Sequence, residues 1–102
     1  PMGPVLVHHS VMPAPQDITV KCFVNGELRQ SETFDLLIFD VPRMIATLSS
    51  GMTLLPGDVI STGTPAGVGL GFDPPIYLKA GDVVELGIDG LGTQQQTAVK
   101  ES

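Results

Sequence analysis

The residues best suited to chemistry lie between Gly57 and Gly69, where the sequence reads Gly-Asp-Val-Ile-Ser-Thr-Gly-Thr-Pro-Ala-Gly-Val-Gly. We expect a short strand at Val59–Ile60, followed by a loop with closely spaced glycines. Glycine permits positive φ and lets another group approach the main chain, and successive N–H groups in a turn form a concavity that suits anions. With the hydroxyls of Thr62 and Thr64 added, this loop predicts a site for a carboxylate.

The same loop also fits a plain connection, because glycine and proline punctuate all-β proteins and Thr-Gly-Thr-Pro alone is no specific signature. Irregular sequence continues through Leu70–Tyr77, which contains Pro74 and Pro75. The whole connection is then about fifteen residues long, a length that is uncommon inside a compact domain and is commonly functional or disordered. Its length favours a site.

No other catalytic constellation is visible, since the sequence has no nucleophile elbow, no phosphate-binding glycine motif with lysine and no cysteine–histidine zinc spacing. His8 and His9 would point to opposite faces of a strand, so both could not hold one metal ion without a bend. We interpret them as loop histidines, with an acid–base role left open by the near-neutral pKa of histidine. Cys22 falls on an apolar strand face, which favours a buried, inert thiol over a nucleophile.

The acidic residues are scattered rather than clustered. Asp35 and Asp40 lie near the start of a predicted helix, and Asp58 and Asp82 lie in Gly-Asp turns. A carboxylate in a turn usually accepts hydrogen bonds from backbone N–H groups. We therefore favour structural roles over metal ligation, and the chain supplies at most one wall of a catalytic centre.

The composition is that of a small acidic protein, read as one domain over residues 1–102. Apolar residues make up 42% of the chain and aromatic ones 5%, which suits a packed sheet of aliphatic side chains. At this length roughly 60–65% of the unfolded surface would be buried, so the core is modest and a partner could complete it.

Charge and apolar patterning exclude several classes of partner. A net charge of −6 without any basic cluster argues against nucleic-acid binding by phosphate neutralisation. No apolar run approaches the roughly 18–20 residues that span a bilayer, and no basic segment followed by an apolar one stands at the beginning. A single cysteine cannot form an internal disulfide. We expect a soluble, cytoplasmic protein with no membrane partner.

Two antiparallel strand pairs are predicted. Ile18–Val24 alternates apolar and polar residues, and Asn25-Gly26 is the strongest short signal for a type I′ hairpin turn, so Glu27–Thr33 should return antiparallel. Val83–Ile88 and Thr93–Val99, joined by a glycine-rich turn, form the second pair. These pairs predict a mainly β fold.

One helix is predicted, beginning after Asp40. Asp40 is a suitable N-cap, Pro42 lies in the first turn where its missing N–H costs nothing, and apolar residues follow at helical spacing. Gly51 is placed to end the helix in a left-handed conformation. We expect this helix to close one end of the sheet rather than to enter a partner's groove. A further short strand is expected at Val5–Val7.

These motifs together resemble the fumarylacetoacetate hydrolase family. The stretch Pro56–Gly69 is similar to that family's Pro-Gly-Asp-Val-Ile-x-Thr-Gly-Thr-Pro-Ala-Gly-Val-Gly. Other short motifs occur in the order and approximate spacing of the family's C-terminal half: Met2-Gly3-Pro4, Pro15-Gln16-Asp17, Val24-Asn25-Gly26-Glu27, Ile38-Phe39, Leu48-Ser49 and Gly81-Asp82-Val83-Val84. The resemblance covers essentially the whole chain.

The resemblance implies a mixed β-roll or sandwich of the fumarylacetoacetase C-terminal-like type, mainly β with one short helix and here a partial fold. It implies a hydrolase, hydratase, isomerase or decarboxylase of 2-oxo acids or acylpyruvates, as in aromatic catabolism. The reaction would pass through an enolate bound to Mg²⁺, or to Mn²⁺ or Ca²⁺, with the metal acting as a Lewis acid. By the same resemblance Thr64 binds the substrate's carboxylate or keto-acid end, and Gly63, Pro65 and Gly67 shape the loop.

The resemblance also places the acidic metal ligands, the active-site lysine and the acid–base histidine upstream of the Met-Gly-Pro stretch. We therefore expect no catalytic and no metal-ligating residue in this chain, which would act in a homodimer or together with the missing N-terminal half. The alternative is a non-catalytic β-rich module or half-fold whose exposed strands and apolar faces associate with another chain.

Overall fold

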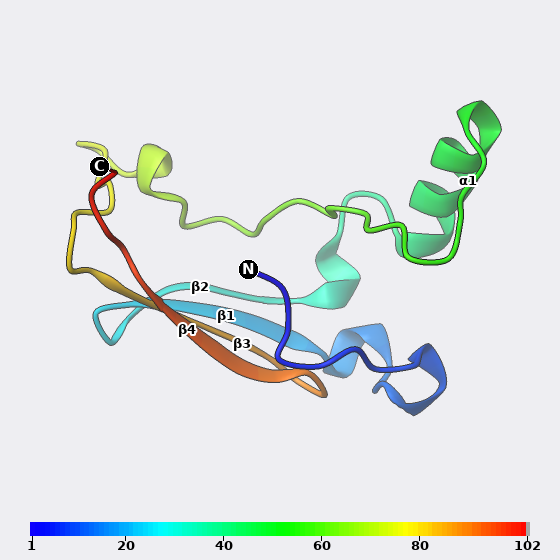
Figure 1. Cartoon of the computed structure of the whole chain (residues 1–102), viewed down its shortest axis with the longest axis horizontal. Coiled ribbons are helices and arrows are strands. Elements are labelled where there is room, and N and C mark those ends of the chain that lie inside the picture. The colour runs from blue at the N-terminus through cyan, green and yellow to red at the C-terminus, as the bar shows by residue number, and fades with distance from the viewer. Residues whose placement is uncertain (102) are drawn as a thin grey trace.

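A four-stranded antiparallel sheet forms the body of the chain (Figure 1). The structure is a computed structural model that describes residues 1–101. The strands occur in the order β2-β1-β3-β4, with bounds β1 Thr19–Val24, β2 Glu27–Thr33, β3 Val83–Ile88 and β4 Gly92–Thr97. The two predicted pairs are thus joined through β1 and β3, which confirms the mainly β fold with one α-helix.

The β1–β2 hairpin turns as predicted and then departs from simple pairing. Asn25 and Gly26 have φ values of 51° and 79°, as a type I′ turn requires. Further along, Phe23 pairs with Leu28 but Cys22 pairs with Gln30. Arg29 is therefore the extra residue of a β-bulge, and the bulge places Gln30 opposite Cys22.

Side chains of the turns hold the sheet together at one end. The Asn25 side chain accepts a hydrogen bond from Val83 N at 2.9 Å and donates one to Asp82 Oδ1 at 2.9 Å. The other carboxylate oxygen of Asp82 accepts from Lys79 N at 2.8 Å. Asp58 makes the equivalent bond with Leu55 N at 2.7 Å. The structural roles predicted for these two aspartates are confirmed.

Helix α1 (Val41–Gly51) begins as predicted and ends differently. Asp40 Oδ1 accepts a hydrogen bond from Arg43 N at 2.8 Å, which confirms the N-cap. The prediction that Gly51 ends the helix in a left-handed conformation is wrong: Gly51 is the last helical residue, and Met52 N donates to Leu48 O at 3.1 Å. Because that bond continues the i to i−4 pattern, no left-handed residue is needed. Figure 1 shows α1 standing apart from the sheet rather than closing its end.

Two predicted strands do not form. Val5–Val7 and Val59–Ile60 have no strand to pair with and run as irregular chain. The second predicted pair is shorter than expected, because β4 ends at Thr97 and leaves Val99 82% exposed.

The connection between α1 and β3 contains one 3₁₀ turn and no other regular element, so it is longer than predicted. The 3₁₀ turns are η1 His9–Val11, η2 Pro15–Asp17, η3 Phe34–Leu36 and η4 Gly69–Gly71.

The sheet buries little of its own apolar surface. Only Ile18 and Cys22, with 6% and 9% of their surface exposed, are buried hydrophobic residues of the described chain. Leu6 is fully exposed, Ile38 is 92% exposed and Val59 72% exposed. These exposed apolar side chains lie in the connecting segments, outside the strands and the helix. Over residues 1–101 no helix is long and apolar enough to cross a membrane.

We predict that Asn25→Ala raises the pKa of Asp82. The Asn25 amide, followed by the Lys79 N–H, holds the pKa of that carboxyl below its ordinary value. The bonds therefore stabilise the fold above the unfolded pKa of about 3.9, and this stabilisation is lost as pH falls through the lower folded value. In an NMR titration of the folded protein, the Asp82 midpoint should move up in the variant. An unchanged midpoint would show that the amide does not set it.

Candidate functional site

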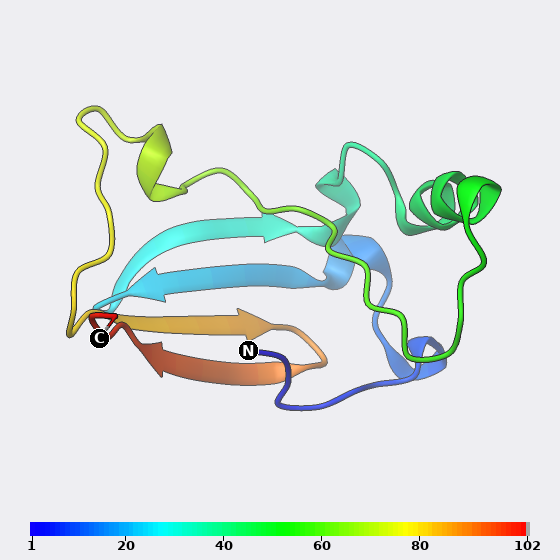
Figure 2. The ribbon, with the colours of Figure 1, turned by 45° about the horizontal axis from the view of Figure 1, so that its top comes forward.

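A hollow of about 220 Å³ lies on one face of the sheet, between two irregular segments. Its floor is made by apolar side chains of the two central strands: Val20, Cys22, Leu86 and Ile88. One wall is the loop at Gly63–Pro65, beside the β2 edge, and the other is Gly3–Pro4, beside β4. Figure 2 shows the long connection after α1 running along β2, with the N-terminal segment over the opposite edge.

The loop wall is fixed to β2 by side-chain hydrogen bonds. Gln30 Nε2 donates to Thr64 Oγ1 at 2.8 Å and to the carbonyl oxygen of Pro65 at 2.7 Å. Beyond these bonds, the main chain at Gly67 lies so close to β2 that a Cβ atom there would collide with Arg29 O. The Arg29 guanidinium also lies 5.1 Å from the centre of the Phe72 ring. Two successive residues of β2 thus support the loop.

The N-terminal wall is held by β4. Gln94 Nε2 donates to Gly3 O at 2.6 Å, and Gln96 Nε2 donates to Gln94 Oε1 at 2.8 Å. Pro4 lies over the turn at Gly92, where an added Cβ atom would come within 3.4 Å of the proline ring. Each edge strand therefore carries one wall of the hollow.

Three of the four residues predicted to shape the site line this hollow: Gly63, Thr64 and Pro65. Gly67 lies outside it and seats the loop on β2. Both glycines have positive φ, 92° at Gly63 and 106° at Gly67. Thr62, whose hydroxyl was expected to share in anion binding, is exposed and is not among the lining residues.

The hollow offers neutral hydrogen-bond donors and no charge. None of its lining residues has an ionised side chain at neutral pH. Thr64 is exposed, and among the described residues no backbone N–H from 59 to 68 bonds to a backbone carbonyl. Such free N–H groups, together with a hydroxyl, can hold a carboxylate. The balancing positive charge has to come from outside this hollow.

Gln30 is the site residue that the sequence analysis missed. In a regular hairpin with a two-residue turn at Asn25-Gly26, Cys22 would face Arg29, and Gln30 would lie on the opposite face of the sheet. The bulge at Arg29 reverses this and places Gln30 beside Cys22, on the face with the hollow. No glycine or other turn residue near Arg29 in the sequence predicts that bulge.

The other candidate residues of the sequence analysis are Cys22 and the two histidines. Burial raises the pKa of the Cys22 thiol, which keeps it protonated and agrees with the inert role predicted for it. His8 and His9 are not on a strand: their ring centres lie only 4.4 Å apart, and His8 Nδ1 lies 2.8 Å from Ser10 Oγ. Among residues 1–101, no three His, Cys, Asp or Glu side chains come together as a metal site.

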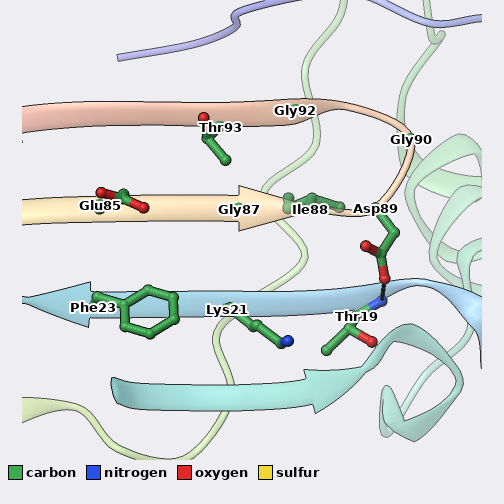
Figure 3. Close-up of a pocket in the computed structure, with 10 residues that line it drawn as sticks. All are labelled: Thr19, Lys21, Phe23, Glu85, Gly87, Ile88, Asp89, Gly90, Gly92 and Thr93. Atoms are coloured by element: carbon green, nitrogen blue, oxygen red, sulfur yellow. Dashed lines mark hydrogen bonds between the residues drawn. The ribbon is translucent and has the colours of Figure 1, made fainter. Parts of the chain in front are cut away.

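A second and wider hollow, of about 360 Å³, lies on the opposite face of the sheet (Figure 3). Lys21, Phe23 and Glu85 line it, and Asp89 at its end accepts a hydrogen bond from Thr19 N at 2.9 Å. The Asp89 carboxylate therefore joins the β3–β4 turn to the start of β1. Because the sequence analysis singled out the loop at Thr64, and that loop lines the hollow on the first face, we take the hollow at Thr64 as the candidate site.

Comparison with known proteins places this fold in a family. The sequence profile described as fumarylacetoacetate (FAA) hydrolase C-terminal matches residues 1–99. The oxaloacetate tautomerase YisK of Bacillus subtilis is 55% identical over 93 residues, which are 91% of this chain and 31% of that protein.

Solved structures agree with this match. A fumarylacetoacetate hydrolase of Exiguobacterium antarcticum superposes with a TM-score of 0.93 at 48% identity, over 99% of this chain and 36% of that one. A maleylpyruvate hydrolase of a Sphingobium species, in complex with manganese(II) and pyruvate, gives a TM-score of 0.84 at 38% identity, over 98% and 35%. The chain thus spans about a third of the length of these relatives. The chain belongs to the fumarylacetoacetate hydrolase family and corresponds to its C-terminal region.

Proposed function

We propose that this chain supplies the carboxylate-binding wall of a divalent-metal-dependent enzyme that acts on 2-oxo acids or acylpyruvates. The observation that carries the proposal is the Thr64 hydroxyl at the wall of the hollow, beside a loop with free backbone N–H groups. The names of three relatives agree: an oxaloacetate tautomerase, a maleylpyruvate hydrolase and a 2-hydroxyhepta-2,4-diene-1,7-dioate isomerase from Mycobacterium marinum. Oxaloacetate and maleylpyruvate both carry a carboxylate next to a keto group.

The metal of this proposal does not fit the residues of this chain. The hollow at Thr64 is lined by neutral side chains, and residues 1–101 hold no acidic or histidine cluster. Divalent ions such as Mg²⁺ are bound through carboxylates and water. We therefore place the ligands of Mg²⁺ or Mn²⁺ in sequence outside this chain, which packs against the exposed apolar side chains of the sheet and helix.

The chain's own residues then bind and orient the substrate. The Thr64 hydroxyl and loop N–H groups donate to the carboxylate, and Gly63, with no side chain, lets the ligand approach the backbone. The apolar floor at Val20 and Leu86 keeps water from one side of the bound molecule. Holding the carboxylate at one end fixes where the keto group lies, and such positioning lowers the barrier to reaction.

Removing the Thr64 hydroxyl tests the proposed function. In a chimera where this chain replaces the matching third of the Bacillus subtilis tautomerase, we expect Thr64→Val to lower kcat/KM for oxaloacetate. A charge-assisted hydrogen bond contributes about 1.5–3 kcal/mol, so the loss should be roughly ten- to 150-fold. The change is read from the decay of enol absorbance. Thr64→Ser keeps the hydroxyl and should keep most of the activity, and unchanged kinetics in Thr64→Val would contradict the assignment.

The contact between the loop and β2 gives a second prediction, which compares two glycines with different surroundings. Both need positive φ, which costs a residue with a side chain about 1–3 kcal/mol. At Gly63 an added Cβ atom meets nothing within 4 Å, whereas at Gly67 it meets Arg29 O. In the chimera, Gly67→Ala should therefore lower the thermal midpoint further than Gly63→Ala does. Gly67→Ala should also lower kcat/KM. Equal midpoints in the two variants would show that the loop is not seated on β2.

A further inference from the structure

The Gln30 side chain contacts the proposed carboxylate-binding residue through a single nitrogen. Its Nε2 lies 2.8 Å from Thr64 Oγ1 and 2.7 Å from Pro65 O. Gln30 is half-buried on β2, whereas Thr64 is exposed. The half-buried residue therefore supports the exposed one from the side of the sheet.

The chemistry of Pro65 decides which end of the Gln30 amide faces the loop. A backbone carbonyl oxygen can only accept, so the amide nitrogen, and not the amide oxygen, must point to it. The nitrogen carries two hydrogens, one for each of its neighbours. Thr64 Oγ1, on the same nitrogen, must then be the acceptor of the second bond.

We infer that Gln30 is a positioning residue that keeps the hydrogen of the Thr64 hydroxyl available for donation to the ligand, an inference that rests on the proposed function. A hydroxyl has one hydrogen and two lone pairs. Because Gln30 occupies a lone pair, the hydrogen stays free, and no other side-chain partner of Thr64 occurs in the described part of the chain. The free O–H suits a ligand group that only accepts. This free hydrogen can be donated to a carboxylate, while the second lone pair of the oxygen stays open.

The β-bulge makes this arrangement possible. The extra residue at Arg29 brings Gln30 to the face that carries Cys22 and the hollow. The same stretch of β2 receives the main chain at Gly67. Gln30 therefore holds Thr64 from a strand, and the loop backbone is also held at Pro65 and Gly67, on the C-terminal side of Thr64.

A double-mutant cycle in the same chimera tests the inference. The variants are Gln30→Met, which removes the donor at similar volume, Thr64→Val, and the two combined. We expect Gln30→Met to raise KM for oxaloacetate about threefold to tenfold, the effect of one ordinary hydrogen bond. In the Thr64→Val background the same change should be less than about twofold, because the residue through which Gln30 acts is then missing. An equal effect in both backgrounds would overturn the inference.

Gln30→Glu gives an independent readout at nearly unchanged shape. A carboxylate only accepts, so it would take the Thr64 hydrogen for itself and repel Pro65 O. We expect the affinity for oxalate, measured by calorimetry with Mn²⁺ present, to fall at least as far as in Thr64→Val. Oxalate affinity that equals that of the unmodified chimera would overturn the inference even if Gln30→Met failed to fold.

Two further results separate this inference from the proposed function. If Thr64→Val leaves oxaloacetate kinetics unchanged, both fall. If Thr64→Val is impaired but Gln30→Met adds its full effect to it, only the role of Gln30 falls. Gln95→Met is the matched control: Gln95 is exposed on β4, next to Gln94 and so on the other face of the sheet, and its KM should not change.

Discussion

The attachment of the long connection to β2 is the constraint on which the candidate site depends. A loop rich in glycine has many conformations, and ordering it costs entropy at every residue. Here Gln30 bonds to two neighbouring loop residues, and the backbone of Arg29 receives Gly67. These contacts hold Thr64 beside β2. A single β-bulge thus converts a flexible connection into one wall of a site.

The rest of the chain leaves much of its apolar surface exposed. Its sheet has apolar side chains on the floor of the hollow but buries only Ile18 and Cys22 well. Helix α1 stands clear of the sheet with Val41 and Ile45 exposed. The chain spans about a third of the length of its relatives, and its own residues cover little of its apolar surface.

Local chemistry was enough to predict most of the elements. Turn residues fixed the hairpin at Asn25-Gly26 and the aspartate turns, and Asp40 fixed the start of α1, because each acts within a few residues of itself. One failure was local, the left-handed helix end expected at Gly51, and the others were non-local. Val5–Val7 and Val59–Ile60 have strand-like sequences but no partner strand. The position of Gln30 in the site depends on a bulge that shifts the pairing by one residue, and no local signal in the sequence marks it.

The same attachment has a consequence for the order in which the chain folds. The bonds from Gln30 to Thr64 and Pro65 join residues 34 and 35 positions apart, whereas the β1–β2 hairpin closes through a two-residue turn. Pairings between residues close in sequence form early. Contacts between distant residues form later, because closing the long loop between them costs conformational entropy. The loop has no surface to settle on until β2 has paired with β1 and bulged at Arg29. The loop at Thr64 therefore takes up this position only after the hairpin has formed, and any defect in the hairpin is passed on to it.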